Sequence, residues 1–203
     1  ESLELLKDYK NIIYTLGGHR LEDFKNRDMI IKSAGVPLDS IYITEARKNK
    51  IPIEMSTSLF AQLTPATIVG ITGTRGKSTV THLLYEILKV AFPQKQIFLG
   101  GNVKGIATLP LLETPKKGDI AVLELDSWQL QGFSEAKISP HIAVFTTFFS
   151  DHLNYYKNNL DRYMEDKVSI FINQKSEDFL VLGSQVSEIV LSKYKKIIKS
   201  KII

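Results

Sequence analysis

A short glycine-containing segment, Gly73-Thr-Arg-Gly-Lys-Ser78, carries the residue types that bind a nucleotide phosphate. Gly73 and Gly76 allow the backbone to turn so that its N–H groups face inward around an anion. Lys77 can then reach the β- and γ-phosphates, and the hydroxyl of Ser78 can ligate Mg²⁺. The predicted ATP-binding residues are Gly73, Thr74, Arg75, Gly76, Lys77, Ser78 and Thr79.

The elements around this segment decide between two interpretations. Residues 67–72 are apolar at their centre, as expected of a strand buried on both faces of a sheet. Apolar residues then recur at helical spacing from Val80 to Ala91, and Pro93 closes the pattern. Ile71 stands where the full G-x-x-x-x-G-K-[ST] pattern has its first glycine, so an ordinary helix-capping turn with a solvated lysine is the alternative. A strand, a tight turn and a helix in this order favour nucleotide binding.

Apolar runs of strand length alternate with helical patterns along the chain, which is typical of a parallel α/β sheet. A second amphipathic helix is expected over residues 160–172, and residues 195–203 have the pattern of a beginning strand. A boundary is expected around residues 62–66, where Leu63-Thr-Pro65 interrupts a helical stretch. The predicted strands lie near residues 28–32, 41–42, 67–72, 96–100, 120–125, 141–147 and 179–182.

The composition argues against several classes of protein. The chain has 203 residues, of which 43% are hydrophobic and 24% charged, the balance of a globular protein. It has no cysteine, so it has no disulfide framework and no thiolate zinc site. No apolar run approaches the ~20 residues that span a bilayer, and we expect no membrane partner. The net charge of +4 mildly favours anionic partners, but no nucleic-acid-binding signature accompanies it, and we expect no nucleic-acid partner.

Three ionisable side chains outside the glycine segment are candidates for chemistry, and each has an ordinary alternative. Glu124 ends a predicted buried strand, at the edge where ligands bind in open α/β sheets, although an isolated Glu there is more often solvated or paired. His152 follows another predicted strand, where an isolated histidine is most often a loop or helix-cap residue. Lys167 lies beside the apolar stripe of the predicted helix 160–172, where most lysines are solvated.

Several motifs together resemble those of the Mur ligases and their folylpolyglutamate synthetase relatives. Thr72-Gly-Thr-Arg-Gly-Lys-Ser-Thr79 has the form of the family's phosphate loop. Two motifs resemble the branch of the family that adds D-glutamate, namely Gly100-Gly-Asn-Val103 and Val122-Leu-Glu-Leu-Asp-Ser-Trp-Gln-Leu130. Other matching segments are Asp151-His-Leu153, Glu165-Asp-Lys-Val-Ser-Ile-Phe171, Leu16-Gly-Gly-His19 and Lys32-Ser-Ala-Gly-Val-Pro37. The resemblance covers nearly the whole chain.

The resemblance implies ATP and two Mg²⁺ ions as cofactors and Lys77, Glu124, His152 and Lys167 as catalytic residues. Ser78 and Glu124 would hold the first ion and His152 the second. Lys167 would be carbamoylated by CO₂, which turns the amine into a carboxylate-like metal ligand and requires it to be neutral. The implied substrate-binding residues are Ser33, Gly35, Asn102, Ser127 and Gln129. Asn102 is equally compatible with a turn, and the last two with ordering the loop after Glu124.

The resemblance also implies a two-part α/β fold. Residues 1–66 would be part of a Rossmann-like UDP-sugar-binding domain, and residues 67–203 a P-loop NTPase-type central ATP-binding domain, truncated at its C-terminal end, with helices flanking a mostly parallel sheet. The family's C-terminal domain would be absent, so we expect the isolated chain to be inactive. The implied reaction adds D-glutamate to UDP-N-acetylmuramoyl-L-alanine through an acyl phosphate, in peptidoglycan-precursor synthesis by a cytoplasmic monomer.

Several residues depart from the family's pattern. Asp126 stands where serine is usual, and Thr147 where asparagine is commoner. Ala34 replaces a proline, Asn154 replaces an aspartate, and Gly183-Ser-Gln185 replaces N-A-D, which weakens any prediction about adenine contacts. Two alternatives therefore stay open: a sister ligase for another amino acid or for folate, and a nucleotide-binding module without ligase activity.

Overall fold

The computed structural model describes residue 4, residues 6–152 and residues 154–203. Within these residues the chain forms two compact units, one made of Glu1–Ile30 and Val36–Ile53 and the other of Ile31–Gly35 and Glu54–Ile203. The larger unit contains the predicted phosphate loop. Leu153, which completes one of the matching motifs, lies outside the described residues.

The smaller unit contains a 3-10 helix, η1 (Leu21–Phe24), and an α-helix, α2 (Ile41–Lys48). The hydroxyl of Ser40 accepts a hydrogen bond from the Ile43 N–H at 3.3 Å and caps α2. The predicted strand at residues 41–42 is therefore wrong. The cap, and the burial of Ile43 and Ala46 on one helical face, outweigh the local β propensity of Ile-Tyr-Ile.

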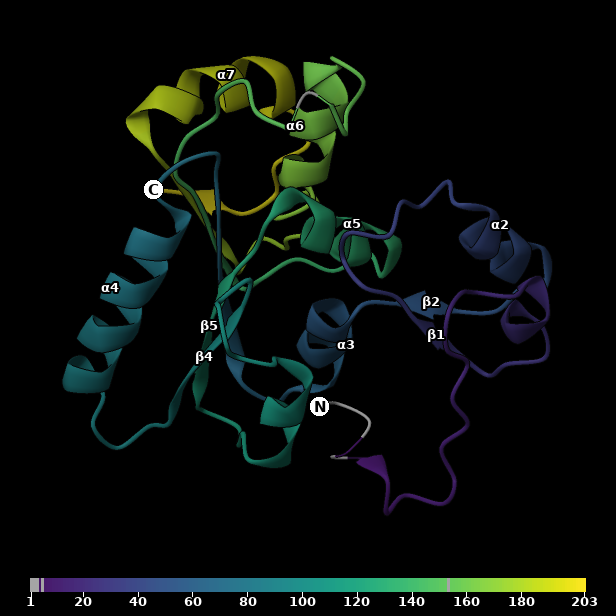
Figure 1. The fold of residues 1–203 in the computed structure, drawn as a ribbon. Coiled ribbons are helices and arrows are strands. Elements are labelled where there is room, and N and C mark those ends of the chain that lie inside the picture. The colour runs from purple at the N-terminus through teal and green to yellow at the C-terminus, as the bar shows by residue number, and fades with distance from the viewer. Residues whose placement is uncertain (1–3, 5, 153) are drawn as a thin grey trace. The chain divides into compact units, whose positions relative to one another are not determined.

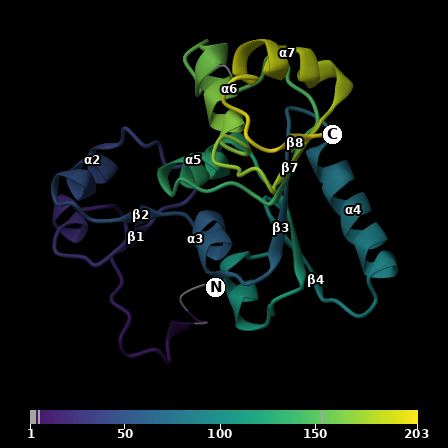
Figure 2. The same ribbon diagram turned by 180° about the vertical axis from the view of Figure 1, so that it is seen from behind.

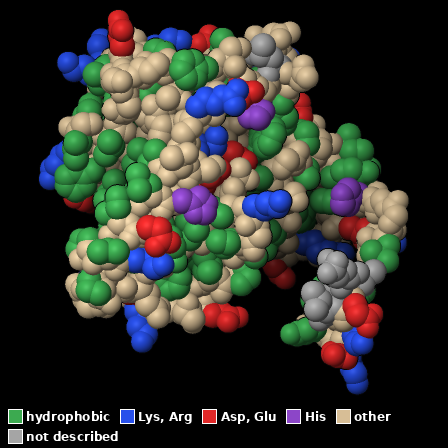
Figure 3. All heavy atoms as spheres, turned by 60° about the vertical axis from the view of Figure 1, so that its left-hand side comes forward, with side chains coloured by type: hydrophobic (Ala, Val, Ile, Leu, Met, Phe, Trp, Pro, Cys, Tyr) green, Lys and Arg blue, Asp and Glu red, His purple; other side chains and the backbone are tan. Residues whose placement is uncertain are grey.

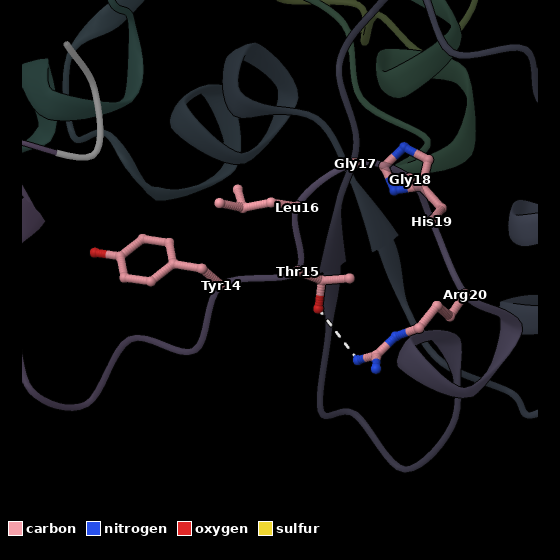
Figure 4. Close-up of a pocket in the computed structure, with 7 residues that line it drawn as sticks. All are labelled: Tyr14, Thr15, Leu16, Gly17, Gly18, His19 and Arg20. Atoms are coloured by element: carbon pink, nitrogen blue, oxygen red, sulfur yellow. Dashed lines mark hydrogen bonds between the residues drawn. The ribbon is translucent and has the colours of Figure 1, made fainter.

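Figure 4 shows the loop of the smaller unit that contains Leu16-Gly-Gly-His19, where Tyr14–Arg20 line a shallow pocket. The guanidinium of Arg20 donates a hydrogen bond to the Thr15 hydroxyl at 3.3 Å, drawn as a dashed line (Figure 4). The same guanidinium forms an ion pair with Asp23 at 2.8 Å. The positive charge at this pocket is thus already balanced by a carboxylate.

The larger unit is built on a parallel sheet that, in the described part of the chain, has six strands in the order β4-β5-β3-β6-β7-β8 (Figure 1). These strands are β3 (Thr67–Thr72), β4 (Ile97–Gly101), β5 (Ile120–Glu124), β6 (Ile142–Phe145), β7 (Phe179–Leu182) and β8 (Lys201–Ile202). Ile71 in β3 pairs with Glu124 in β5, and Thr72 pairs with Phe145 in β6. The carboxyl ends of the three central strands therefore meet at one edge. A second, two-stranded sheet pairs β1 (Ile30–Ile31) with β2 (Ile53–Glu54), where the division between the units falls.

Helices cover both faces of the larger sheet, as Figures 1 and 2 show from opposite sides. They are α3 (Ser56–Leu63), α4 (Lys77–Ala91), α5 (Ser127–Glu135), α6 (Leu160–Val168) and α7 (Ser184–Tyr194), with a 3-10 helix, η2 (Leu109–Glu113). On one face, Val80, Leu84 and Leu88 of α4 pack against the apolar side chains of β3 and β5. On the other face, α3, α5, α6 and α7 enclose the larger core. This double cover explains the continuous apolar character of the central strands.

Most predicted elements of the larger unit are confirmed, with shifts at their ends. The predicted strand 179–182 coincides with β7, and the strand expected after residue 195 is β8. The predicted helix 160–172 is shorter, because α6 ends at Val168 and the backbone continues through turns to Asn173. Its apolar stripe continues into these turns, since Ile170 and Phe171 are buried. The sequence periodicity therefore predicted the buried face correctly but overestimated the length of the helix.

The smaller unit ends at Ile53, before α3, whereas the sequence predicts a domain boundary near residue 66. The reason is that α3 packs on α5: Phe60 is fully buried in the larger core, and the Gln129 amide donates to the Thr57 hydroxyl at 3.2 Å. The boundary after residue 66 stays a prediction about the family's domains.

Among the described residues, no helix combines the length and apolar character needed to cross a membrane. On the face in Figure 3, Lys and Arg side chains are interspersed with Asp and Glu. The absence of membrane and nucleic-acid partners stays a prediction.

Candidate active site

The phosphate loop connects the end of β3 to the start of α4. Its two glycines have positive φ angles, +151° at Gly73 and +84° at Gly76, which side-chain-bearing residues rarely adopt. A Cβ at Gly73 would also collide with the Thr146 hydroxyl. The positive φ angles and the close approach explain why the sequence has glycine at these positions. The N-terminus of α4 then begins at Lys77, with Ser78 exposed beside it.

The segment that follows β6 fixes the backbone of this loop. The Thr74 N–H donates to the Thr147 carbonyl at 2.8 Å, and the Arg75 N–H donates to the Thr147 hydroxyl at 2.9 Å. The Thr146 hydroxyl donates to the Arg75 carbonyl at 2.6 Å. Thr147, noted above as a departure from the family's pattern, therefore has a local role in shaping the phosphate loop.

A second set of contacts holds the next residues of the same segment. The Thr74 hydroxyl accepts a hydrogen bond from the Phe149 N–H at 3.0 Å and donates to the Phe149 carbonyl at 3.2 Å. The Gln185 amide pairs with the backbone of Phe148, accepting from its N–H at 2.8 Å and donating to its carbonyl at 2.9 Å. Sequence reasoning noted Gln185 only as a departure, because no local signal shows that its partner lies in the segment after β6.

Two lysines lie at the first residue of the loop. The Lys77 ammonium donates to the carbonyl oxygen of Gly73 at 3.0 Å and to that of Thr74 at 3.4 Å. The Lys167 amine reaches the same Gly73 oxygen at 3.1 Å and the Thr72 hydroxyl at 3.4 Å. Lys167 is only 1% exposed, and its burial, together with the charge of Lys77, lowers its pKa to about 7. The ordinary alternative of a solvated lysine is thus wrong for Lys167.

Glu124 ends β5 at the same edge of the sheet. Its carboxylate is buried, with 4% of the residue exposed, and accepts a hydrogen bond from the Asn102 amide at 3.4 Å. Among the described residues no ion pair neutralises this carboxylate. A buried carboxylate without a cationic partner suits a metal ion, so the site fits Mg²⁺ at Glu124. The predicted residues Asn102 and Glu124 are also joined through the backbone, where the Asn102 N–H donates to the Glu124 carbonyl at 2.8 Å.

His152 lies in an aromatic cluster beside this edge. Its ring centroid lies 5.1 Å from that of Trp128 and 5.9 Å from that of Tyr163, and its backbone has a φ of +52°. Within the described part of the chain, its side chain makes no hydrogen bond to Glu124 or Lys167, and no three His, Cys, Asp or Glu side chains converge as a metal site. The metal role of His152 therefore stays a prediction.

The loop after Glu124 is ordered by its own side chains. The Asp126 carboxylate accepts the Gln129 N–H at 2.7 Å, and the Gln129 carboxamide oxygen accepts the Asp126 N–H at 3.3 Å, which forms a capping box on α5. Asp126 can therefore replace the usual serine without loss of the cap. Ser127, in the first turn of α5, is buried at 2% exposure. These contacts support the structural alternative for Ser127 and Gln129.

The predicted residues Ser33 and Gly35 lie in the loop that follows β1. The Lys32 ammonium donates to the Ser33 carbonyl at 3.3 Å and to the Ala34 carbonyl at 3.4 Å. This lysine is 6% exposed. The ammonium of Lys32 thus lies against the backbone of this loop, next to the predicted residues Ser33 and Gly35. Lys32 was not among the residues predicted from the motif.

The fold and the site together define a P-loop-type α/β domain. A central parallel strand leads into a glycine turn, Lys77 and Ser78 start the helix that follows, and helices cover both faces of the sheet. The model of the Mur ligase middle domain matches residues 71–202. The chain belongs to the Mur ligase family.

The curated relatives are named UDP-N-acetylmuramoylalanine--D-glutamate ligase. The protein from Borreliella burgdorferi (strain ZS7) is 38% identical over 195 residues, which are 96% of this chain and 41% of the relative. The protein from Treponema pallidum (strain Nichols) is 34% identical over 196 residues, 90% of this chain and 36% of the relative. The chain therefore spans about two fifths of the length of the relatives it matches.

Solved structures show the same fold. The MurF ligase from Thermotoga maritima in complex with ADP has a TM-score of 0.53 and 22% identity, over 79% of this chain and 43% of that one. UDP-N-acetylmuramate:L-alanyl-gamma-D-glutamyl-meso-diaminopimelate ligase from Neisseria meningitides has a TM-score of 0.59 and 15% identity, over 86% of this chain and 57% of that one.

Proposed function

We propose that the protein containing this chain is an ATP-dependent amide ligase that joins D-glutamate to UDP-N-acetylmuramoyl-L-alanine in peptidoglycan-precursor synthesis. The observation that carries this proposal is the convergence of the phosphate loop, the buried Glu124 and the buried Lys167 at one edge of the sheet. Its substrate pair follows from the names of the relatives at 34–38% identity.

ATP would bind with its phosphates against the N–H groups of Gly76–Ser78 at the N-terminus of α4, because the N–H groups of Thr74 and Arg75 already donate to Thr147. The Lys77 ammonium would exchange its two backbone carbonyl partners for the β- and γ-phosphate oxygens. Ser78, which is exposed, and Glu124 would hold a Mg²⁺ ion that neutralises charge on the transferring phosphoryl group.

A second Mg²⁺ would involve His152 and Lys167. A protonated amine cannot bind a cation, but a carbamate formed with CO₂ would supply two oxygens that share one negative charge. The pKa of about 7 makes a large fraction of Lys167 neutral near physiological pH, and the neutral amine is the form that attacks CO₂. Imidazole is an unusual ligand for Mg²⁺, so the role of His152 depends on the family resemblance alone.

The reaction follows from the poor reactivity of a carboxylate. A carboxylate oxygen of the L-alanyl group attacks the γ-phosphorus of ATP, the bond to the bridging oxygen breaks, and ADP leaves. The amine of D-glutamate then attacks the acyl carbon, the amine loses a proton, and phosphate departs with the oxygen it took from the carboxylate. The protein's contribution is to place positive charge around the phosphoryl group and to hold the reactants in line.

The nucleotide sugar would be bound by Ser33 and Gly35 near its diphosphate and by Asn102 near its alanyl arm. Ser127 and Gln129 would act by ordering the loop after Glu124. We propose a cytoplasmic monomer with these small-molecule substrates. The residues that recognise D-glutamate are expected in the part of the protein outside this chain, which spans about two fifths of its relatives.

The test uses the full-length protein and UDP-N-acetylmuramoyl-L-alanine labelled with ¹⁸O in its carboxylate. An acyl phosphate transfers one labelled oxygen to each phosphate released in the presence of D-glutamate, which mass spectrometry detects. Unlabelled phosphate would show that ATP is hydrolysed without activating the carboxylate, and would favour a nucleotide-binding module over a ligase. In the Lys77→Ala variant, a wild-type rate of labelled phosphate release would contradict the assignment of the phosphate loop.

A further inference from the structure

We propose that Tyr163 is a positioning residue that ties Lys167 to the phosphate loop. Tyr163 contacts the loop, the lysine and the predicted histidine ligand at once, and none of the sequence motifs singled it out. The inference rests on the proposed function for the role of Lys167, but its contact with the phosphate loop can be tested by nucleotide binding alone.

The hydroxyl of Tyr163 reaches the phosphate loop. Its oxygen lies 3.4 Å from the Thr74 hydroxyl oxygen, and both side chains are buried. Either hydroxyl can donate in this contact. When the single hydroxyl hydrogen of Thr74 is directed to the Phe149 carbonyl at 3.2 Å, the Tyr163 hydroxyl is the donor. This bond joins α6 to the residue that holds the phosphate loop against the segment after β6.

The ring of Tyr163 lies beside the Lys167 amine. The Lys167 nitrogen is 4.9 Å from the ring centroid, because residues four apart on α6 share one helical face. The same nitrogen donates a hydrogen bond to the Gly73 carbonyl oxygen at 3.1 Å. The ring and the carbonyl therefore hold the nitrogen at the phosphate-loop edge, where the proposed second Mg²⁺ would take a ligand from Lys167.

The same ring limits the position of His152. The two ring centroids are 5.9 Å apart with an interplanar angle of 77°, an edge-to-face arrangement. Tyr163 also packs on Phe148 at 5.4 Å, whose backbone is paired with Gln185. Tyr163 is 1% exposed, and its contacts connect Lys167 and His152, the predicted ligands of the second metal site, to the phosphate loop.

Tyr156 offers a matched control. It is also buried, at 5% exposure, and its ring centroid lies 5.0 Å from that of Tyr163. Its hydroxyl donates to the Asp166 carboxylate at 2.7 Å instead of to the phosphate loop. Tyr156→Phe therefore removes a buried tyrosine hydroxyl from the same cluster without removing a contact to Thr74.

The first measurement is the affinity of the full-length protein for Mg·ADP by calorimetry, with melting temperatures to confirm folding. We expect Tyr163→Phe to weaken binding about threefold to tenfold, the effect of losing one hydrogen bond that shapes the loop. The Tyr156→Phe variant should bind Mg·ADP with an affinity within about twofold of wild type, because its lost hydrogen bond does not reach the phosphate loop. Equal affinities of wild type and Tyr163→Phe, or equal losses in both Phe variants, would overturn the inference. A wild-type protein that binds no nucleotide would instead overturn the proposed function, and this inference with it.

The second measurement separates the ring from the hydroxyl. Tyr163→Phe keeps the ring, so its kcat for phosphate release should stay within about threefold of wild type while its KM for ATP rises. Tyr163→Leu removes the ring, and its kcat should fall at least about tenfold further. A kcat for Tyr163→Leu equal to that of Tyr163→Phe would overturn the role of the ring. If Tyr163→Leu does not fold, the Mg·ADP affinities of the two Phe variants decide the inference.

Discussion

Lys77 and Lys167 donate to the same atom, the carbonyl oxygen of Gly73, at 3.0 Å and 3.1 Å. Lys77 starts α4 and Lys167 lies in the last turn of α6, so one oxygen of the phosphate loop joins the two helices. Burial is the main cause of the lowered pKa of Lys167, and repulsion by the Lys77 ammonium at the same oxygen lowers this pKa further. Lys167, whose amine loses its proton readily, therefore lies at the edge of the sheet that carries the phosphate loop.

The first prediction concerns the pH dependence of Lys167. Its pKa is lowered from 10.5 to about 7, so the neutral amine fraction rises as pH increases through about 7 and is nearly complete by about pH 8. Carbamate formation releases one further proton from the neutral amine. At a fixed concentration of dissolved CO₂, the ratio of carbamate to unmodified Lys167, measured by ¹³C NMR with labelled bicarbonate, should therefore rise about 100-fold per pH unit below about pH 7 and about tenfold per pH unit above it. Lys167→Met should remove the signal and Lys89→Met, on the exposed face of α4, should not. A ratio that keeps rising about 100-fold per pH unit well above about pH 8 would contradict the lowered pKa.

The second prediction concerns the buried carboxylate of Glu124. Glu124→Gln keeps the shape and the contact with Asn102 but removes the negative charge that would hold Mg²⁺. We expect D-glutamate-dependent phosphate release to fall at least about 100-fold, with partial recovery at raised Mg²⁺. Glu86→Gln on the exposed face of α4 is the control and should leave the rate unchanged. A small loss at Glu124 that does not depend on Mg²⁺ would contradict the metal role.

The third prediction concerns the close approach of β4 to Glu124. Gly101 has a φ of +85°, and a Cβ there would collide with the Glu124 carbonyl. Gly105 has a φ of +81° and open space around it, so it carries the same backbone strain without the collision. Both Ala variants should lose stability in urea unfolding, and Gly101→Ala should lose about 1–3 kcal/mol more than Gly105→Ala. Equal losses would show that the close approach has no energetic consequence.

The fourth prediction concerns the cap of α5. Asp126→Ala removes the acceptor of the Gln129 N–H and should cost about 1–2 kcal/mol in the free energy of unfolding. Asp126→Ser, which introduces the family's usual residue, keeps a capping oxygen and should cost about 0.5 kcal/mol or less. Equal stabilities of the Ala and Ser variants, measured by urea unfolding, would show that the capping box is not the reason for the polar residue.

Much of the fold could be predicted from the sequence, because apolar runs and glycine turns are local signals. The strand at residues 67–72 and the helix start at Lys77 are found as predicted, since burial on both faces and the turn leave few alternatives. The strand expected at residues 41–42 failed because a cap at Ser40 and tertiary burial overrode local propensity. The end of α6 was missed because its apolar stripe continues beyond the helix.

Residues of the candidate site could be predicted from the sequence where a motif requires one residue type. Contacts between residues distant in sequence could not be predicted. Lys167 could be named from its motif, but its burial comes from the packing of α6 on the loop after β3. The contacts of Tyr163 and Gln185 could not be predicted, because they join residues far apart in the chain, as in the pair Gln185 and Phe148. The structural role of Gln129 likewise became clear only from its capping contacts.

The measurement that tests the central claim most directly is phosphate release by the full-length protein with ATP, Mg²⁺ and UDP-N-acetylmuramoyl-L-alanine against a panel of amino acids. The account predicts release that depends on D-glutamate and is accompanied by formation of the amide product. Release that depends on a different amino acid would keep the phosphoryl-transfer chemistry but contradict the proposed substrate. No amino-acid-dependent release with any member of the panel would contradict the assignment of ligase activity itself.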